Sequence, residues 1–239
     1  MVYVDGFVAA VPAGNKAAFL KHSQEAAALS KEFGAARQVE TWGDDVPEGK
    51  VTDFRRAVQA EADEVVIFSW LEYPDKATRD ACMAKMMSDP RMEAIAMPFD
   101  GKRMIYGGFE SLVDERNGDA GSPGYVDGFL VAVPTINKDA YRDMSLKAWD
   151  VFRDYGAKRH VEMWGDDVPE GKVTDFRRAV QSTGEETVVF SWIEWESQEA
   201  RSKGWEQIMA DPRMKYDPAD NPFDGKRMIY GGFELLLDV

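Results

Sequence analysis

The chain has 239 residues, of which 44% are hydrophobic and 12% aromatic, and its formal net charge at pH 7 is -14. This composition is typical of a globular protein with a substantial core. The acidic balance argues against nucleic acids and anionic membranes as partners, because both attract a basic surface.

The sequence pattern of residues 1–114 predicts a first structural unit, in which strands and helices follow the order βαββαβ. Residues 3–11 form a strand that ends at Pro12, and a helix follows between Asn15, a candidate cap, and Gly34. The remaining elements are strands at residues 36–42 and 65–73, a helix at residues 76–88, a short helix after Asp89, and a strand at residues 102–113. This order is the split βαβ of ferredoxin-like domains.

The rest of the chain repeats the first unit. Residues 42–59 return unchanged as residues 164–181, and residues 98–110 return as residues 222–234. The segment at residues 115–124 is rich in glycine and predicts a linker between ferredoxin-like repeats at residues 1–114 and 125–239. Each unit would leave one sheet face bare, so we expect the two faces to bury each other. The predicted fold is α+β, a fused dimeric α+β barrel, and further homo-oligomerisation stays open.

The two copies differ unevenly along the chain. Their first helices agree only at Asn15, Lys16, Ala18, Ser23 and Ala26, whereas the repeated segments named above do not differ at all. Side chains alternate between the two faces of a strand. On one face of the third strand the copies match throughout, and on the other only Ser69 is kept, as Ser191. We therefore expect the unchanged face, with Trp70 and Glu72, to point between the halves.

The same alternation on all four strands predicts one acidic and aromatic interior. The candidate ligand-binding residues are Asp5, Glu40, Trp42, Trp70, Glu72, Tyr106, Asp127, Glu162, Trp164, Trp192, Glu194 and Tyr230. Carboxylates in an aromatic cavity would have pKa values raised by desolvation, which suits a general acid or base. The alternative is a structural network, because cationic partners are available at Arg37, Arg55, Arg56, Lys102 and Arg103.

No metal is predicted. Asp44, Asp45 and Glu48 lie together in the connection after the second strand, but they lack a metal-loop spacing and have basic neighbours. We expect this connection to be ordered instead, with Arg55 or Arg56 bonded to a carboxylate, and to touch the opposite half.

No cofactor is predicted either. Neither histidine repeats, so a symmetry-related catalytic or haem histidine is not expected; His160, for example, aligns with Gln38. A one-sided role for His160 stays open, because it lies two residues from Glu162 on the same strand face.

Two further features bear on the cellular compartment. The single cysteine aligns with a glycine of the other copy, so an intrachain disulfide is excluded. No apolar run reaches the roughly 18 residues of a membrane span, and no basic leader is present. We therefore expect a cytoplasmic location and no membrane partner.

Three motifs occur twice in the same order. They are Tyr-Val-Asp-Gly-Phe from Tyr3, Trp-Gly-Asp-Asp-Val-Pro-Glu-Gly-Lys-Val-Thr-Asp-Phe from Trp42, and Phe-Asp-Gly-Lys-Arg-Met-Ile-Tyr-Gly-Gly-Phe-Glu from Phe99. Together they resemble the YbaA-like family of uncharacterised bacterial proteins, here as a tandem duplication. The resemblance covers essentially all of both halves. It implies the dimeric α+β barrel superfamily, whose members include cofactor-independent monooxygenases, small-molecule isomerases and haem enzymes, and it assigns no catalytic residue.

The leading hypothesis is therefore a barrel that binds an unknown small molecule or catalyses a cofactor-independent reaction. The alternative is a non-catalytic structural or protein-interaction module. An open cavity lined by Asp5, Glu40, Trp70 and Glu72 would favour the first hypothesis. A packed interior in which each acid forms a salt bridge would favour the second.

Overall fold

The structure is a computed structural model that describes residues 2–118, 121–215 and 220–239. The N-terminal half contains β1 (Tyr3–Pro12), α1 (Lys16–Glu32), β2 (Arg37–Asp45), α2 (Phe54–Ala57), β3 (Glu64–Tyr73), α3 (Lys76–Ser88), α4 (Pro90–Ala94) and β4 (Ile105–Arg116). The C-terminal half contains β5 (Tyr125–Pro134), α5 (Lys138–Asp154), β6 (Arg159–Asp167), α6 (Phe176–Ala179), β7 (Glu186–Trp195), α7 (Gln198–Ala210) and β8 (Ile229–Asp238).

Local signals explain most element boundaries. The Asp89 side chain accepts a hydrogen bond from the backbone N–H of Arg91 and caps α4, as predicted. Asn15 precedes α1 but does not cap it, because its side-chain amide donates instead to the backbone oxygen of Pro98 at 2.8 Å. The short helices α2 and α6 were not predicted. β4 continues to Arg116, inside the predicted linker, of which residues 119–120 lie outside the described residues.

The eight strands close into one antiparallel barrel. Their order around it is β1-β3-β2-β8-β5-β7-β6-β4. The halves join at two seams, where β2 pairs with β8 and β4 pairs with β6. Closure pairs the strands that would otherwise be sheet edges, so it removes the sites at which another chain could add a strand.

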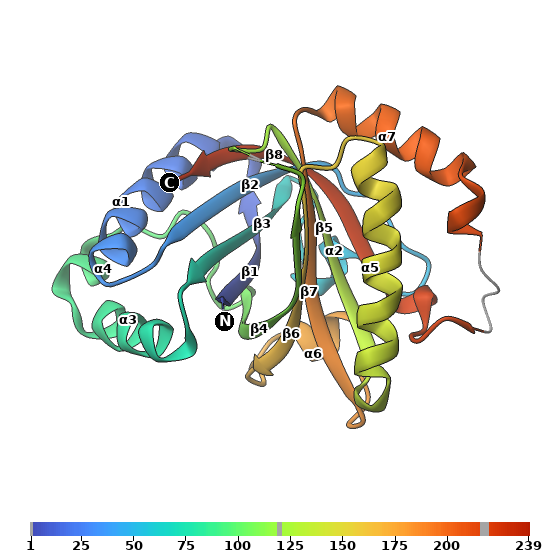
Figure 1. The fold of residues 1–239 in the computed structure, drawn as a ribbon. Helices are drawn as coiled ribbons and strands as arrows, with labels where there is room; N and C mark the ends of the chain where they lie inside the picture. The colour runs from blue at the N-terminus through green and yellow to red at the C-terminus, as the bar shows by residue number, and fades with distance from the viewer. Residues whose placement is uncertain (1, 119–120, 216–219) are drawn as a thin grey trace.

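The helices of the two halves lie on opposite sides of the barrel. Figure 1 shows α1, α3 and α4 on one side and α5 and α7 on the other. The helix-free faces of both halves therefore surround a common interior, and one core cluster joins residues of both halves, among them Phe68, Trp70, Phe190 and Trp192. The burial of these faces on each other, which the sequence predicted, is confirmed.

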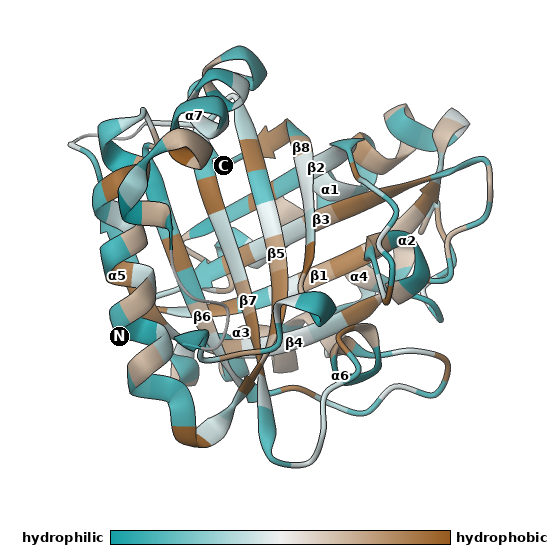
Figure 2. Ribbon diagram, turned by 90° about the vertical axis from the view of Figure 1, so that its right-hand side faces the viewer, coloured by the Kyte–Doolittle hydropathy of each residue, from teal (hydrophilic) through white to brown (hydrophobic). Residues whose placement is uncertain are grey.

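Both faces of the sheet are largely apolar. Figure 2 shows hydrophobic residues along the strands, while α5 and α7 carry many hydrophilic residues. Separate clusters pack the helices onto the outer face in each half. Within the described residues, no helix combines the length and the apolar character that a membrane crossing needs.

Candidate functional site

The predicted site residues lie on two different faces of the sheet. Trp70 and Glu72 point into the interior as expected, but the facing predicted for the other three strands was wrong. Directly paired residues of antiparallel strands share a face, and Glu72 pairs with Val4 rather than with Asp5. The predicted residues that lie on the outer, helix-covered face are Asp5, Glu40, Trp42, Tyr106, Asp127, Glu162, Trp164 and Tyr230.

The middle of the barrel is filled by aromatic rings. Phe68 and Phe190 stack with their centroids 4.3 Å apart, and the centroids of Trp70 and Trp192 are 4.4 Å apart. A Cβ atom added to Gly6 would lie 2.8 Å from the Phe190 ring. This packing favours the structural alternative for the interior.

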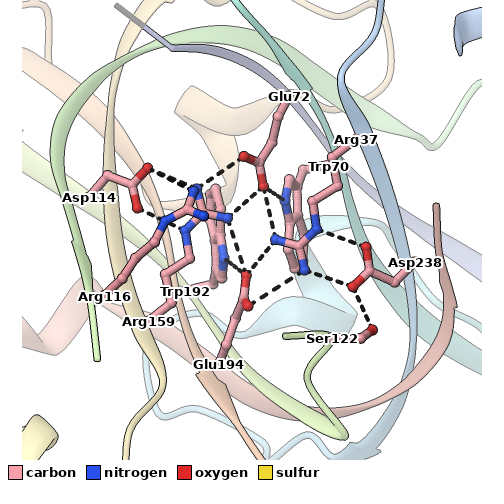
Figure 3. Close-up of polar contacts among 10 residues, drawn as sticks. All are labelled: Arg37, Trp70, Glu72, Asp114, Arg116, Ser122, Arg159, Trp192, Glu194 and Asp238. Atoms are coloured by element: carbon pink, nitrogen blue, oxygen red, sulfur yellow. Dashed lines mark hydrogen bonds and ion pairs between the residues drawn. The ribbon is translucent and has the colours of Figure 1, made fainter. Parts of the chain in front are cut away.

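Charged groups close one end of the barrel (Figure 3). Arg37 Nη1 donates to Oε1 of Glu72 at 3.1 Å and to Oε1 of Glu194 at 2.8 Å. Arg159 Nη1 donates to Oε1 of Glu72 at 2.7 Å and lies 3.4 Å from Oε1 of Glu194. Two indole N–H groups also donate to these glutamates, those of Trp70 and Trp192. Each glutamate therefore meets both guanidinium groups.

This charge cluster is structural in character. Burial alone would raise the pKa of Glu72, but the hydrogen bonds and charges of Arg159 and Arg37 hold it below its ordinary value. Asp238 and Asp114 add further ion pairs, at 2.8 Å to Arg37 Nε and to Arg159 Nε respectively. A carboxyl held in this way, as that of Glu72 is, stays ionised near neutral pH and does not supply a proton.

The opposite end of the barrel is closed by the connection that was expected to clasp the halves. Phe54 of α2 is fully buried in the shared core. The Thr52 hydroxyl donates to the backbone oxygen of Ala179 in the other half at 2.6 Å, and the reciprocal bond measures 2.7 Å. Arg56 lies 3.4 Å from the Asp53 carboxylate. Order, ion pairing and contact with the other half are thus confirmed.

Two of the three acids weighed as metal ligands also join the two halves. Asp44 accepts a hydrogen bond from the Tyr125 hydroxyl at 2.8 Å and another from Gln198 at 2.6 Å, and Asp45 pairs with Arg201 at 2.8 Å. Among the described residues, no group of three or more His, Cys, Asp or Glu side chains is placed to hold a metal ion.

A different set of polar groups is buried between the sheet and the helices of the N-terminal half. We call Asp5, Ser23, Gln38, Glu40 and Ser69 the N-terminal layer; each is at most 8% exposed. Glu40 accepts one hydrogen bond, from Gln38 Nε2 at 2.7 Å. The hydroxyls of Ser23 and Ser69 and the Oδ2 atom of Asp5 have no hydrogen-bond partner among the described residues. Three unpartnered polar atoms thus share one layer.

The carboxyl of Glu40 differs from those in the barrel interior. Burial raises its pKa to about 7, and the nearby Ser69 hydroxyl and the Gln38 amide lower it only in part. Ser69 is close enough to influence Glu40, although its hydroxyl lacks the geometry of a hydrogen bond. No cationic group contributes to this pKa. Glu40 therefore carries a proton during part of the time at neutral pH.

The equivalent layer in the C-terminal half has more hydrogen bonds, although Nδ1 of His160 has no partner among the described residues. Glu162 accepts a hydrogen bond of 2.8 Å from the Tyr141 hydroxyl and one of 3.3 Å from Ser145, and it lies 2.9 Å from His160 Nε2. The contact between His160 and Glu162 that the sequence indicated is confirmed. The residue equivalent to Tyr141 is Phe19, which has no hydroxyl.

The C-terminal layer is also more aromatic. Trp149 and Phe152 lie beside His160, with ring centroids 6.3 Å and 5.3 Å away. Their equivalents in the N-terminal half are Ala27 and Ser30, both buried. Two large rings in one half thus correspond to two small side chains in the other.

The aspartates of the first strands show the same contrast. Asp127 accepts hydrogen bonds from the indoles of Trp195 and Trp205 at 2.8 Å and 2.6 Å, and its other oxygen accepts one from Arg201 at 2.8 Å. Asp5 accepts a hydrogen bond from Arg79 at 2.7 Å, and the Tyr73 side chain lies close enough to lower its pKa. Burial raises the pKa of Asp5 to about 6 even with Arg79 beside it.

The remaining predicted residues lie at the edges of these layers. Trp42 packs on Phe19 with a centroid distance of 6.2 Å, and Tyr106 is 45% exposed on the outer face. Strand pairing places Tyr106 next to Phe7, and Phe7 next to Ser69. A row of side chains therefore leads from the surface to the N-terminal layer.

Sequence reasoning did not identify Ser23, Gln38 and Ser69 as site residues. A signal was present for two of them, because Ser69 is the one residue kept on its strand face and Ser23 is one of the few residues kept in the first helix. Gln38 gave no such signal, since His160 replaces it in the other copy.

Comparisons with solved structures show a shared fold. A putative monooxygenase from Fusobacterium nucleatum subsp. nucleatum is 9% identical, with a TM-score of 0.60 and coverage of 99% of this chain and 93% of that one. A putative monooxygenase from Lactobacillus acidophilus is 9% identical, with a TM-score of 0.57 and coverage of 100% and 96%. An anthrone oxidase-like protein is 11% identical, with a TM-score of 0.53 and coverage of 100% and 92%. These similarities establish the α+β barrel and no activity.

Sequence comparison shows the family. The uncharacterised protein YbaA of Escherichia coli (strain K12) is 65% identical over 117 residues, which are 48% of this chain and 100% of that protein. YbaA of Shigella flexneri shows the same identity and coverage. The model of the protein family of unknown function DUF1428 matches residues 2–101 and again residues 124–225. Because these two matches span most of the chain, the protein belongs to the DUF1428 family and is a tandem duplication of a YbaA-like unit.

Proposed function

We propose that the protein binds a small molecule in the N-terminal layer and that Glu40 exchanges a proton with it, without a cofactor. The barrel interior then serves to hold the two halves together. One observation carries the proposal: Glu40 and Glu162 occupy equivalent positions, yet Glu40 accepts one hydrogen bond whereas Glu162 contacts three polar side chains.

The energetic cost of the N-terminal layer supports a functional role. A buried polar atom without a partner costs about 1–3 kcal/mol, so native proteins contain few of them. Here Asp5, Ser23 and Ser69 each contribute one such atom, while in the C-terminal half Ser145 bonds to Glu162 and Asp127 accepts from Trp195. The C-terminal layer has one such atom among the described residues, Nδ1 of His160. Side chains that are unsatisfied in the free protein are available to bind a ligand.

The protonation state of Glu40 fits acid–base chemistry. A group is most effective as a general acid and base when its pKa lies near the working pH. Burial brings the pKa of Glu40 to about 7. Its carboxyl therefore donates a proton to a bound acceptor in one form and takes up a proton in the other.

A row of neighbouring side chains on the outer face of the sheet connects this layer with the surface. Tyr106 is exposed, and its cross-strand neighbour Phe7 is half-buried next to Ser69. Ligand pockets combine apolar walls with a few polar groups, and this row has that composition.

Two wider observations are consistent with the proposal. Solved structures with this fold include two putative monooxygenases and an anthrone oxidase-like protein, so the names of these proteins associate the barrel with small-molecule chemistry. The strand order β4-β1-β3-β2 within the N-terminal half supports describing each half as a ferredoxin-like βαββαβ unit.

A second candidate function is a non-catalytic structural or protein-interaction module. The observation in its favour is the packed interior, where Glu72 and Glu194 are held in ion pairs. The two candidate functions make different predictions for the N-terminal layer. A structural or protein-interaction module would bind no small molecule there.

A thermal-shift screen with a panel of neutral small organic molecules tests the proposal. Molecules that raise the melting temperature of the wild type should lose most of this effect in Glu40→Gln and retain it in Glu162→Gln, the matched control in the other half. Equal responses of the two variants would place binding elsewhere. A panel without any response in the wild type would favour the structural candidate.

A further inference from the structure

We infer that Asn117 is a site of spontaneous deamidation in the connection between the two halves. Deamidation would change the covalent structure of the chain and does not depend on the proposed function. Two groups react, the side-chain amide of Asn117 and the backbone nitrogen of Gly118.

The reaction is an intramolecular acyl transfer followed by hydrolysis. The nitrogen of Gly118 attacks the side-chain carbonyl carbon of Asn117 and closes a five-membered succinimide ring. The proton of that nitrogen leaves with the side-chain amide as ammonia. Water then adds to one of the two ring carbonyls and breaks its bond to the nitrogen. Opening at the former side-chain carbonyl gives aspartate, and opening at the backbone carbonyl gives isoaspartate.

The sequence sets Asn117 apart from the other asparagines. Of the four asparagines in the chain, only Asn117 precedes a glycine. Glycine has no Cβ atom, so its backbone nitrogen is the least shielded from attack on a neighbouring group. Asn15 and Asn137 each precede a lysine, and Asn221 precedes Pro222, whose nitrogen has no proton to lose.

The structure leaves both reacting groups unrestrained. The side-chain amides of Asn15 and Asn137 each donate to a backbone oxygen at 2.8 Å, which holds them in place. Among the described residues, by contrast, no hydrogen bond involves the side chain of Asn117 or the backbone N–H of Gly118. The attacking nitrogen and the attacked carbonyl can therefore approach each other without breaking a contact.

Water also reaches this pair. Asn117 and Gly118 are both exposed, and apart from the chain neighbours no atom lies within 4 Å of the place where a Cβ atom of residue 118 would be. The φ angle of Gly118 is 64°, which glycine adopts without strain. Access of water therefore does not limit the hydrolysis of the ring.

The barrel should tolerate both products. Asn117 follows β4, and its backbone N–H donates to the backbone oxygen of Lys158 at 2.9 Å. The bonds that change lie after this nitrogen, toward residue 118. The pairing of β4 with β6 is therefore kept, while the connection gains a carboxylate and, in the isoaspartate form, a longer main chain.

Incubation of the full-length protein at neutral and at mildly alkaline pH tests the inference. Trypsin cuts after Arg116 and Lys138, so one peptide contains Asn117 together with Asn137 as an internal control. Mass spectrometry measures the fraction of each amide that has become an acid, and a sample digested before incubation corrects for deamidation during digestion. Gly118→Ala is the variant of the attacking residue, because its Cβ atom shields the nitrogen and disfavours the positive φ.

We expect Asn117 to convert with time, and faster at the alkaline pH because the attacking nitrogen must lose its proton, while Asn137 stays an amide. Conversion in Gly118→Ala should be about tenfold slower, as for an increase of ~1.4 kcal/mol in the barrier. Each converted chain should focus at a more acidic pH, because it carries one more negative charge. Asn117→Asp should melt at the wild-type temperature, since exposed substitutions change stability little.

Three results would overturn the inference. They are an Asn117 that stays an amide at alkaline pH, a conversion of Asn137 as fast as that of Asn117, and equal rates in the wild type and Gly118→Ala. A lower melting temperature of Asn117→Asp would contradict the tolerance of the barrel. None of these results bears on Glu40, so the proposed function is decided separately by Glu40→Gln.

Discussion

Phe68 and Phe190 stack face to face across the middle of the barrel, with their ring centroids 4.3 Å apart and their planes 7° from parallel. Each ring also lies against a glycine of the opposite half, Phe190 on Gly6 and Phe68 on Gly128. The stack therefore requires small residues at both glycine positions. Both halves contribute one ring and one glycine, which ties their folding together.

Gly6→Ala should destabilise the protein because the new Cβ atom would lie 2.8 Å from the Phe190 ring. Overpacking of a filled core costs about 1–3 kcal/mol, so the midpoint of urea denaturation should fall accordingly. Gly14→Ala is the control, since nothing lies within 4 Å of the Cβ position there. Equal midpoints for the two variants would mean that the interior tolerates extra volume.

The double variant Glu72→Gln with Glu194→Gln should unfold much earlier than the wild type. It would leave the partly buried Arg37 and the buried Arg159 with only part of their negative partners, and breaking buried ion pairs costs about 3–5 kcal/mol. Glu110→Gln with Glu234→Gln, at exposed equivalent positions, should stay within about 1 kcal/mol of the wild type. Wild-type stability of the Glu72 and Glu194 double variant would contradict the structural role assigned to the charged cluster.

Removing a hydrogen bond between the two halves at the other end of the barrel should lower the free energy of unfolding by a smaller amount. Thr52→Val removes the hydroxyl that donates to the backbone oxygen of Ala179 at 2.6 Å and leaves that buried oxygen with one partner fewer. Loss of one such hydrogen bond costs about 0.5–1.5 kcal/mol. Thr135→Val, in which an exposed hydroxyl is removed, should change the unfolding free energy less. A larger loss of unfolding free energy in Thr135→Val than in Thr52→Val would contradict the stabilising role of the Thr52 hydrogen bond.

The sequence predicted most of the helices and strands from their apolar patterns. It predicted the burial of the two helix-free faces from the repeat. It did not predict which parity of each strand faces inward. β1 shows the reason: its interior face carries Val4, Gly6 and Val8, while Tyr3 and Phe7 lie on the outer face. Both faces of this sheet are buried, so alternation alone gives no direction.

The candidate site was only partly predictable for a related reason. Glu40 was selected as a candidate, but its hydrogen-bond partners come from residues that only the folded chain brings close to it, and these residues differ between the two halves. Whether a buried acid is ionised depends on the partners that the fold brings to it, such as Arg159 for Glu72 and Gln38 for Glu40. Residue type alone did not distinguish the two.

The stability of the protein should fall between pH 4.5 and pH 7 because of Glu40. Burial raises its pKa from 4.5 to about 7 in the folded state. Between these values the folded chain holds a proton that the unfolded chain has released, so the contribution of Glu40 is complete below the lower pKa and is lost as the pH passes the higher one. The loss amounts to ~3 kcal/mol, since each pKa unit corresponds to about 1.4 kcal/mol.

Urea denaturation at a series of pH values measures this loss as a difference between variants. Glu40→Gln cannot titrate, so its stability should decline less than that of the wild type over this window. Asp5, whose pKa burial raises to about 6, titrates in every variant and cancels in the comparison. Parallel curves for the wild type and Glu40→Gln would show that Glu40 is ionised in the folded protein and would remove the proton donor from the proposed site.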